Sequence, residues 1–284
     1  MPLFLPLLLQ AYDPEIEAVM NRSRRQKQAE VAAAAASPSA TRTDGRIPVP
    51  AKYAAPFQAC LDEATQSPEA GVAFAQKWRI DGGSFYARHC MGFAYARAER
   101  WSPAIVAFEQ AAEEAEREGE VAQSARLWAQ AGNAALASGD AAKARQNFDA
   151  ALARGMADGL EKGEVHLDRA RALVALGEGG AARESLDVAL AQAPQDPLGW
   201  LLSATLARRQ GEMRLAQAHV ARAVQLSPDD PSVALEEGNI AILTDHADVA
   251  RSAWERAVKL APDSPAGKAA ADNLSRLPQA APAG

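Results

Sequence analysis

Aromatic side chains are scarce in this chain, at 6% of its 284 residues, so little surface is offered on which nucleic-acid bases could stack. Its four histidines, His89, His166, His219 and His246, do not fall into the spacing of a zinc-dependent hydrolase. Its two cysteines lack the paired histidines that would complete a tetrahedral zinc site. Patterns for a nucleophile elbow, a phosphate loop and a dinucleotide-binding turn are absent. We therefore expect no catalytic residue, no metal and no cofactor, and we interpret the chain as a protein that is not an enzyme.

Long apolar runs are also missing, since no stretch approaches the roughly 18–20 residues that a membrane-spanning helix needs. The net charge is −6, and residues 1–56 carry seven Lys or Arg against five Asp or Glu, which leaves −8 on the rest of the chain. An acidic surface repels a phosphate backbone. We therefore expect no integral membrane span and no nucleic-acid partner.

A fixed period of 34 residues is the strongest pattern that is present. Two sets of prolines repeat at this spacing. The first set is Pro194, Pro228 and Pro262, and the second is Pro197, Pro231 and Pro265. Proline is tolerated in the first turn of a helix but not in its interior, so these prolines mark places where one helix ends and the next begins. A period of this length predicts a stack of paired helices.

Within each unit a small residue on the first helix is matched by a large residue on the second. In the unit that starts at Pro231, Gly238 lies on the first helix, and Trp254 lies on the second between Ala250 and Ala257. A small residue lets two helices approach to about 8–10 Å, and spacings of three and four keep these groups on one face. Units in the same phase begin at Phe85, Ala125, Gly163, Pro197 and Pro231.

This pattern resembles the tetratricopeptide repeat (TPR) family from about Phe85 to Pro262. The resemblance implies an all-α, right-handed helix-turn-helix solenoid, the TPR-like superhelix, with a C-terminal cap helix. The implied organisation is a degenerate leading helical pair at 51–84, five TPR-like units at 85–264, a cap helix at 265–277 and a tail at 278–284.

The N-terminus has a different composition. Residues 1–11, MPLFLPLLLQA, read as a signal segment cleaved after Ala11, although the basic residues that normally precede the apolar run are missing. With a signal the protein is periplasmic or secreted, and the alternative is a cytoplasmic protein with an apolar N-terminal strap. Residues 12–50 predict a polar and basic helix followed by a Ser/Pro-rich linker, and we expect this region to be largely disordered.

The two cysteines, Cys60 and Cys90, fall on the first helices of two neighbouring units if the resemblance holds. One disulfide between them would staple the irregular end of the stack. An even number of cysteines in an exported chain favours such a bond. The alternative is two buried free thiols that pack as small hydrophobic groups.

The resemblance also implies a concave groove, built from residues two, five, nine and twelve of each first helix, with six and thirteen at its edges. The groove residues in this sequence are Tyr86, His89, Phe93, Arg97, Arg126, Asn133, Arg171, Leu201, Arg208, Leu235, Asn239 and Ile242. The N-terminal half is cationic and polar, and the C-terminal half is apolar. Such a groove suits an extended peptide or an amphipathic helix with acidic groups at one end. The alternative for each arginine is a surface side chain whose stem covers apolar surface.

From these patterns we predict a non-catalytic protein–protein interaction scaffold that binds a peptide or protein segment in its groove, in cell-envelope assembly if the chain is exported. One alternative is a structural module that associates with itself, which a concentration-dependent mass in light scattering would reveal. A less favoured alternative is an enzyme with an unrecognised site, which would need convergent polar groups with shifted pKa values in a pocket.

Overall fold

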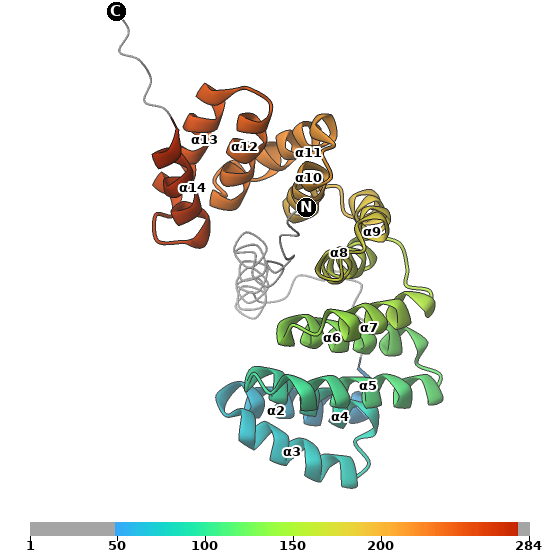
Figure 1. The fold of residues 1–284 in the computed structure, drawn as a ribbon. Coiled ribbons are helices and arrows are strands. Elements are labelled where there is room, and N and C mark those ends of the chain that lie inside the picture. Colours follow the sequence, from blue (N-terminus) through green and yellow to red (C-terminus); the bar gives the residue numbers. More distant parts are fainter. Residues whose placement is uncertain (1–48, 278–284) are drawn as a thin grey trace, which may run out of the picture. The chain divides into compact units, whose positions relative to one another are not determined.

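A computed structural model describes residues 49–277, and these form thirteen α-helices and no β-strand (Figure 1). The chain divides into two compact bodies, which we name the N-terminal body (residues 49–194) and the C-terminal body (residues 195–277). The all-α helical repeat fold predicted from the 34-residue period is confirmed. The predicted signal segment, the predicted basic helix with nearly all of its linker, and the predicted tail lie outside the described residues.

In the N-terminal body each helix packs against the next along the chain. Its helices are α2 (Ala51–Gln66), α3 (Pro68–Ile80), α4 (Ser84–Arg97), α5 (Trp101–Arg117), α6 (Val121–Ser138), α7 (Ala141–Ala153), α8 (Leu160–Ala175) and α9 (Gly179–Gln192). The C-terminal body is built in the same way. Its helices are α10 (Pro197–Arg209), α11 (Met213–Leu226), α12 (Pro231–Leu243), α13 (Ala247–Leu260) and α14 (Pro265–Arg276).

The repeating prolines of the C-terminal body stand at the first position of α10, α12 and α14. The residue before each proline caps the helix through its side chain. Asp196 accepts a hydrogen bond from the amide of Leu198 at 3.0 Å, and Asp230 accepts one from the amide of Ser232 at 2.8 Å. Because such caps satisfy amides that the helix itself leaves unpaired, the Asp-Pro pairs fix where these helices begin.

Close contact between a first and a second helix depends on glycines that face aromatic rings. A methyl group at Gly92 would lie 2.6 Å from the ring of Phe108, and Gly132 stands in the same relation to Phe148. In the C-terminal body Gly238 lies directly against Trp254. These glycines lie near the middle of their helices, so the helix pairs pack along much of their length.

The leading pair α2 and α3 is built differently. Only Ser67 separates the two helices, and Gly71 lies directly against Ala64 beside that connection. At the other end of the pair the rings of Tyr53 and Phe57 lie 6.5 and 6.4 Å from that of Trp78, so α2 and α3 pack along their length. Helix α2 also packs against α4.

Candidate functional site

The side chains predicted to line a groove fall into three groups in the structure, and the first group is buried. Tyr86 is 3% exposed, Leu201 2%, Leu235 3% and Asn239 8%. The ring centroid of Tyr86 lies 4.1 Å from that of Phe85. Burial raises the pKa of Tyr86 to about 12, which keeps its hydroxyl uncharged at neutral pH. The structure therefore does not leave these four side chains open to a partner.

His89 is partly buried among groups from three helices. Its ring centroid lies 5.0 Å from that of Phe57 on α2 and 6.1 Å from that of Phe108 on α5. Burial lowers the pKa of His89 to about 4, and a hydrogen bond with Gln130 on α6 opposes this shift only in part. His89 is therefore neutral at physiological pH and offers no positive charge to an acidic partner.

Three of the predicted groove arginines form the second group, because each is held by a carboxylate. Arg126 Nε lies 2.6 Å from Glu161 Oε1, and Arg126 Nη2 donates to Glu161 Oε2 at 2.8 Å. Arg171 Nη1 donates to Asp168 Oδ1 at 2.6 Å, and both side chains are 10% exposed. These pairs neutralise much of the cationic character that the sequence predicted for the N-terminal half of the groove.

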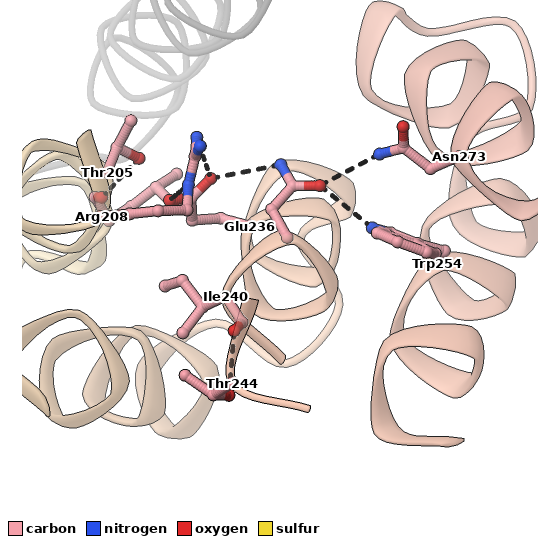
Figure 2. Close-up of polar contacts among 9 residues, drawn as sticks. Thr205, Arg208, Glu236, Ile240, Thr244, Trp254 and Asn273 are labelled. Carbon is pink, nitrogen blue, oxygen red and sulfur yellow. Dashed lines mark hydrogen bonds and ion pairs between the residues drawn. The ribbon is translucent and has the colours of Figure 1, made fainter. Parts of the chain in front are cut away.

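The third arginine of this group, Arg208, belongs to a buried polar network in the C-terminal body (Figure 2). Arg208 Nε on α10 donates to Glu236 Oε1 on α12 at 2.7 Å, and Nη2 donates to Oε2 at 3.1 Å. Asn239 Nδ2 also donates to Glu236, at 3.4 Å. On the far side of α12, Trp254 Nε1 and Asn273 Nδ2 both donate to Asn239 Oδ1, at 3.2 and 3.0 Å. This network ties α10, α12, α13 and α14 together.

The third group stays at least partly open to solvent. In the N-terminal body it comprises Phe93, Arg97 and Asn133 of the predicted groove, together with two residues at position twelve of their units. These five residues lie on the successive first helices α4, α6 and α8, and we name them the open stripe: Phe93, Arg97, Asn133, Leu136 and Val174. Arg97 and Asn133 are exposed, and the other three are partly exposed. Arg97 Nη2 makes a long contact of 3.4 Å with the carbonyl oxygen of Thr65. In the C-terminal body, Ile242 is partly exposed and packs beside the core of α12 and α13.

The two cysteines are joined in the structure. A disulfide links Cys60 on α2 to Cys90 on α4, with 6.2 Å between their Cα atoms, and both residues are fully buried. The bond therefore crosses from the leading helix pair to the next first helix, between the positions that the resemblance brought together.

The carboxylates that hold the groove arginines were not predicted from the sequence. A signal for two of them exists in the spacing, because Arg126 and Glu161 are 35 residues apart and Arg208 and Glu236 are 28 apart. Opposite charges at about one repeat length come together when consecutive first helices lie side by side. Asn239 and Asn273, 34 residues apart, follow the same rule.

Within residues 49–277, no helix combines the length and the apolar character needed to cross a bilayer. In the same range, no group of three or more His, Cys, Asp or Glu side chains is arranged to hold a metal ion.

Comparison with known proteins places the fold. Residues 135–206 match the model of the tetratricopeptide repeat family. No curated protein matches the chain. Among solved structures, PilF of Pseudomonas aeruginosa is similar with a TM-score of 0.62 and 16% identity, over 78% of this chain and 99% of that one. PilW, a widely conserved type IV pilus biogenesis factor, is similar with a TM-score of 0.62 and 16% identity, over 78% of this chain and 98% of that one. YrrB, a TPR protein with an unusual peptide-binding site, has a TM-score of 0.50 and 16% identity, over 76% of this chain and 97% of that one.

Proposed function

We propose that this chain, whose residues 135–206 match the tetratricopeptide repeat family and whose helices form the same kind of repeat fold, is a non-catalytic scaffold. It holds a peptide or protein segment of another molecule against its first helices. The observation that carries the proposal is the open stripe of the N-terminal body. Its residues recur at equivalent places on three consecutive first helices and remain accessible, while most of the other predicted groove residues are buried or paired.

The chemistry of the open stripe suits a peptide. The amide of Asn133 can both donate and accept, which is what a peptide backbone requires. Phe93, Leu136 and Val174 offer apolar contacts, and Arg97 offers the charged group that is least engaged among the stripe and groove arginines. Aromatic anchors beside hydrogen-bonding groups are typical of the residues that dominate binding energy at protein interfaces. YrrB, which shares the fold, has a peptide-binding site, and this analogy is one of fold.

The test is crosslinking in the native host followed by affinity capture and mass spectrometry. The double variant Phe93→Ala/Asn133→Ala removes the central side chains of the open stripe. Because Phe93 also packs against the core of the N-terminal body, a thermal melt first establishes that this variant stays folded. The matched control is Val106→Ala/Gln146→Ala, two exposed residues on the second helices α5 and α7. We expect a partner that wild type and control capture and the stripe variant does not. Equal capture by all three proteins would show that the stripe is not the binding site.

We propose further that the protein works in an oxidising compartment of the cell envelope. The supporting observation is the buried disulfide between Cys60 and Cys90, since disulfides persist in oxidising compartments and are rare in the cytosol. The similarity to PilW, a pilus biogenesis factor, fits this location at the level of fold.

Intact mass of the protein from its native host, alkylated without prior reduction, tests this location. We expect a chain that carries no alkyl group and that lacks the predicted signal segment, residues 1–11. A full-length chain alkylated on both cysteines would place it in a reducing compartment.

A further inference from the structure

The face of the first helices that carries the open stripe is positive at one end. Arg97 stands there, exposed, in the last turn of α4. At the other end of α4, Ser84 Oγ donates to the carboxylate of Glu118 at 2.8 Å, and Glu120 follows directly before α6. The 14 residues of α4 separate Arg97 from these carboxylates by about 20 Å.

The end of this face that holds Glu118 is negative. Residues 113–120 contain five glutamates, of which Glu114 and Glu116 are paired with Arg88 and Arg154. Three glutamates remain against two cations, Arg117 and Lys52, and all five of these residues are exposed: Glu113, Glu118, Glu120, Arg117 and Lys52. After burial, the charges of Glu120 and Glu118 contribute to the raised pKa of Tyr86, which places them beside groove position two.

The chain enters the N-terminal body at this negative end. Val49 packs against the core that holds Phe85 and Tyr86, and the ring centroid of Tyr53 lies 5.0 Å from that of Tyr86. Lys52, between these two residues, lies near Glu118. Residues 1–48 are therefore attached beside Glu118, one helix length away from Arg97.

The sequence of residues 13–27, DPEIEAVMNRSRRQK, has the complementary order of charge. Its acidic residues come first and its basic residues last. Between them Ile16, Val19 and Met20 follow the spacing of one helical face. As a helix, the twelve residues from Glu15 to Lys27 would span about 18 Å, which matches the separation of the two charged ends on the body.

We propose that residues 13–27 of the chain occupy its own open stripe and that a partner must displace them. This inference rests on the proposed scaffold function and concerns the regulation of the same site. The acidic end lies at Arg97, and the apolar residues lie against Phe93, Leu136 and Val174. The basic end lies at Glu118 and Glu120.

The connection to α2 fits this direction. A segment that runs antiparallel to α4 brings its basic end to the place where α2 begins. Residues 28–48 join the two, and 21 residues can reach up to about 70 Å. The segment follows the predicted cleavage site at Ala11, so an exported chain keeps it. A displacing partner then presents the same order of acidic, apolar and basic residues.

Crosslinking within the purified full chain tests where the segment lies. A photo-crosslinking amino acid replaces Val19, and the matched control places it at Ala18, on the opposite side at helical spacing. We expect position 19 to link to peptides that contain Phe93 or Asn133, within one chain, at a yield above that of position 18 and independent of protein concentration. Links to the stripe found only in dimers would assign the site to a second copy. That result, or no link to the stripe, would overturn the proposal.

Competition by a free peptide tests the occupancy. The probe is a synthetic, fluorescein-labelled peptide of residues 12–28. The detached variant is the full chain with Ile16→Ser, Val19→Ser and Met20→Ser, which leaves residues 49–277 unchanged. By fluorescence anisotropy we expect the probe to bind this variant at least about tenfold more tightly than the wild type, because a tethered segment competes at an effective concentration in the millimolar range. Equal titration curves for the two proteins would contradict self-occupancy.

A charge exchange tests the orientation. Arg97→Glu in the detached variant should weaken the probe roughly two- to fivefold, and a probe with Glu15→Lys and Glu17→Lys should recover that loss. A probe that responds to neither change does not place its acidic end at Arg97, which contradicts the proposal. These variants leave Phe93 and Asn133 intact, so a failed probe leaves the scaffold function to the capture experiment alone.

Discussion

Each arginine held at a predicted groove position contacts a carboxylate, but the surroundings of the pairs differ. The side chains of Arg208 and Glu236 are 17% and 4% exposed, whereas those of Arg145 and Glu178, on α7 and beside α9, are 41% and 42% exposed. A buried carboxylate that loses its partner keeps the cost of its desolvation. An exposed one is solvated by water and loses little.

We therefore expect Arg208→Ala to destabilise the C-terminal body by about 3 kcal/mol, because Glu236 would stay buried without its two hydrogen bonds from Arg208, with only Asn239 and the nearby charge of Arg209 to compensate. Arg145→Ala is the matched control and should cost less than about 1 kcal/mol. Urea unfolding of the two variants beside wild type provides the comparison. Equal losses in both would mean that burial does not govern the strength of these pairs.

The pH dependence of stability should carry a contribution from His89. Its pKa in the folded chain, about 4, lies below the ordinary value of 6.5, so the unfolded chain takes up a proton first as the pH falls. Stability is then lost as the pH drops from about 6.5 towards about 4. Between about pH 7 and about pH 5 we expect wild type to lose roughly 2 kcal/mol more than His89→Gln.

Chemical denaturation at both pH values measures this difference. His246→Gln, a change at an exposed histidine, serves as the control and should follow the wild type. A His89→Gln variant that loses as much stability as the wild type would show that His89 is not the titrating group.

At the scale of helices, the distance between the first and the second helix of three pairs, α4 with α5, α6 with α7 and α12 with α13, is set by the match of one glycine to one ring. Gly238 and Trp254 form this match in the C-terminal body, and Gly132 and Phe148 form it in the N-terminal body. The glycine leaves room for the face of the ring, and the aromatic side chain fills it. The units that start at Gly163 and Pro197 hold an alanine with an aliphatic side chain at these positions instead, Ala170 with Leu186 and Ala204 with Val220.

Gly238→Ala should therefore destabilise the C-terminal body by about 1–3 kcal/mol, because the added methyl group meets the indole of Trp254. Gly180→Ala is the control, since it lies in a helix and a methyl group there meets nothing. The control should be neutral or slightly stabilising. Thermal melting of both variants distinguishes the two cases, and an unchanged melting temperature for Gly238→Ala would refute the packing described for α12 and α13.

The disulfide joins α2 to α4 at one end of the N-terminal body, so its loss should destabilise that body alone. Replacing both cysteines, Cys60→Ser with Cys90→Ser, should lower the stability of the N-terminal body by roughly 2–4 kcal/mol. Hydrogen exchange should show faster opening of α2 and α4 and unchanged protection in α12 and α13. If protection falls equally in both bodies, the two do not unfold as separate units.

At the scale of the whole chain, the sequence predicted the helical repeat because its signals are local. Proline fixes the start of a helix through its own ring, so Pro197, Pro231 and Pro265 mark helix starts without any knowledge of the fold. The small residue Gly238 and the large residue Trp254 likewise stand at fixed distances in sequence from the start of their repeat. These features survive in a single sequence because they act within one repeat.

The state of the predicted groove was harder to predict, because it depends on contacts between repeats. Whether Arg126 is open or paired is decided by Glu161 on the next first helix. Whether Tyr86 is exposed is decided by Tyr53 and Phe57 on the preceding one. Repeat phase assigns Asn133 and Asn239 the same position, yet the first is exposed and the second is held by Trp254. The phase of the repeat predicts where on its helix a side chain lies, but contacts with neighbouring repeats determine whether that side chain is exposed or paired.

If the open stripe binds another protein, its exposed side chains lie within crosslinking reach of that protein in the cell. The most direct measurement places a photo-crosslinking amino acid at Asn133 in the native host, with the same substitution at Gln146 on α7 as the control. We predict that irradiation links position 133, and not position 146, to a defined peptide of a partner, identified by mass spectrometry. Crosslinks at both positions to the same proteins, or at position 133 only to the chain itself, would show that the open stripe is not a binding site for another protein.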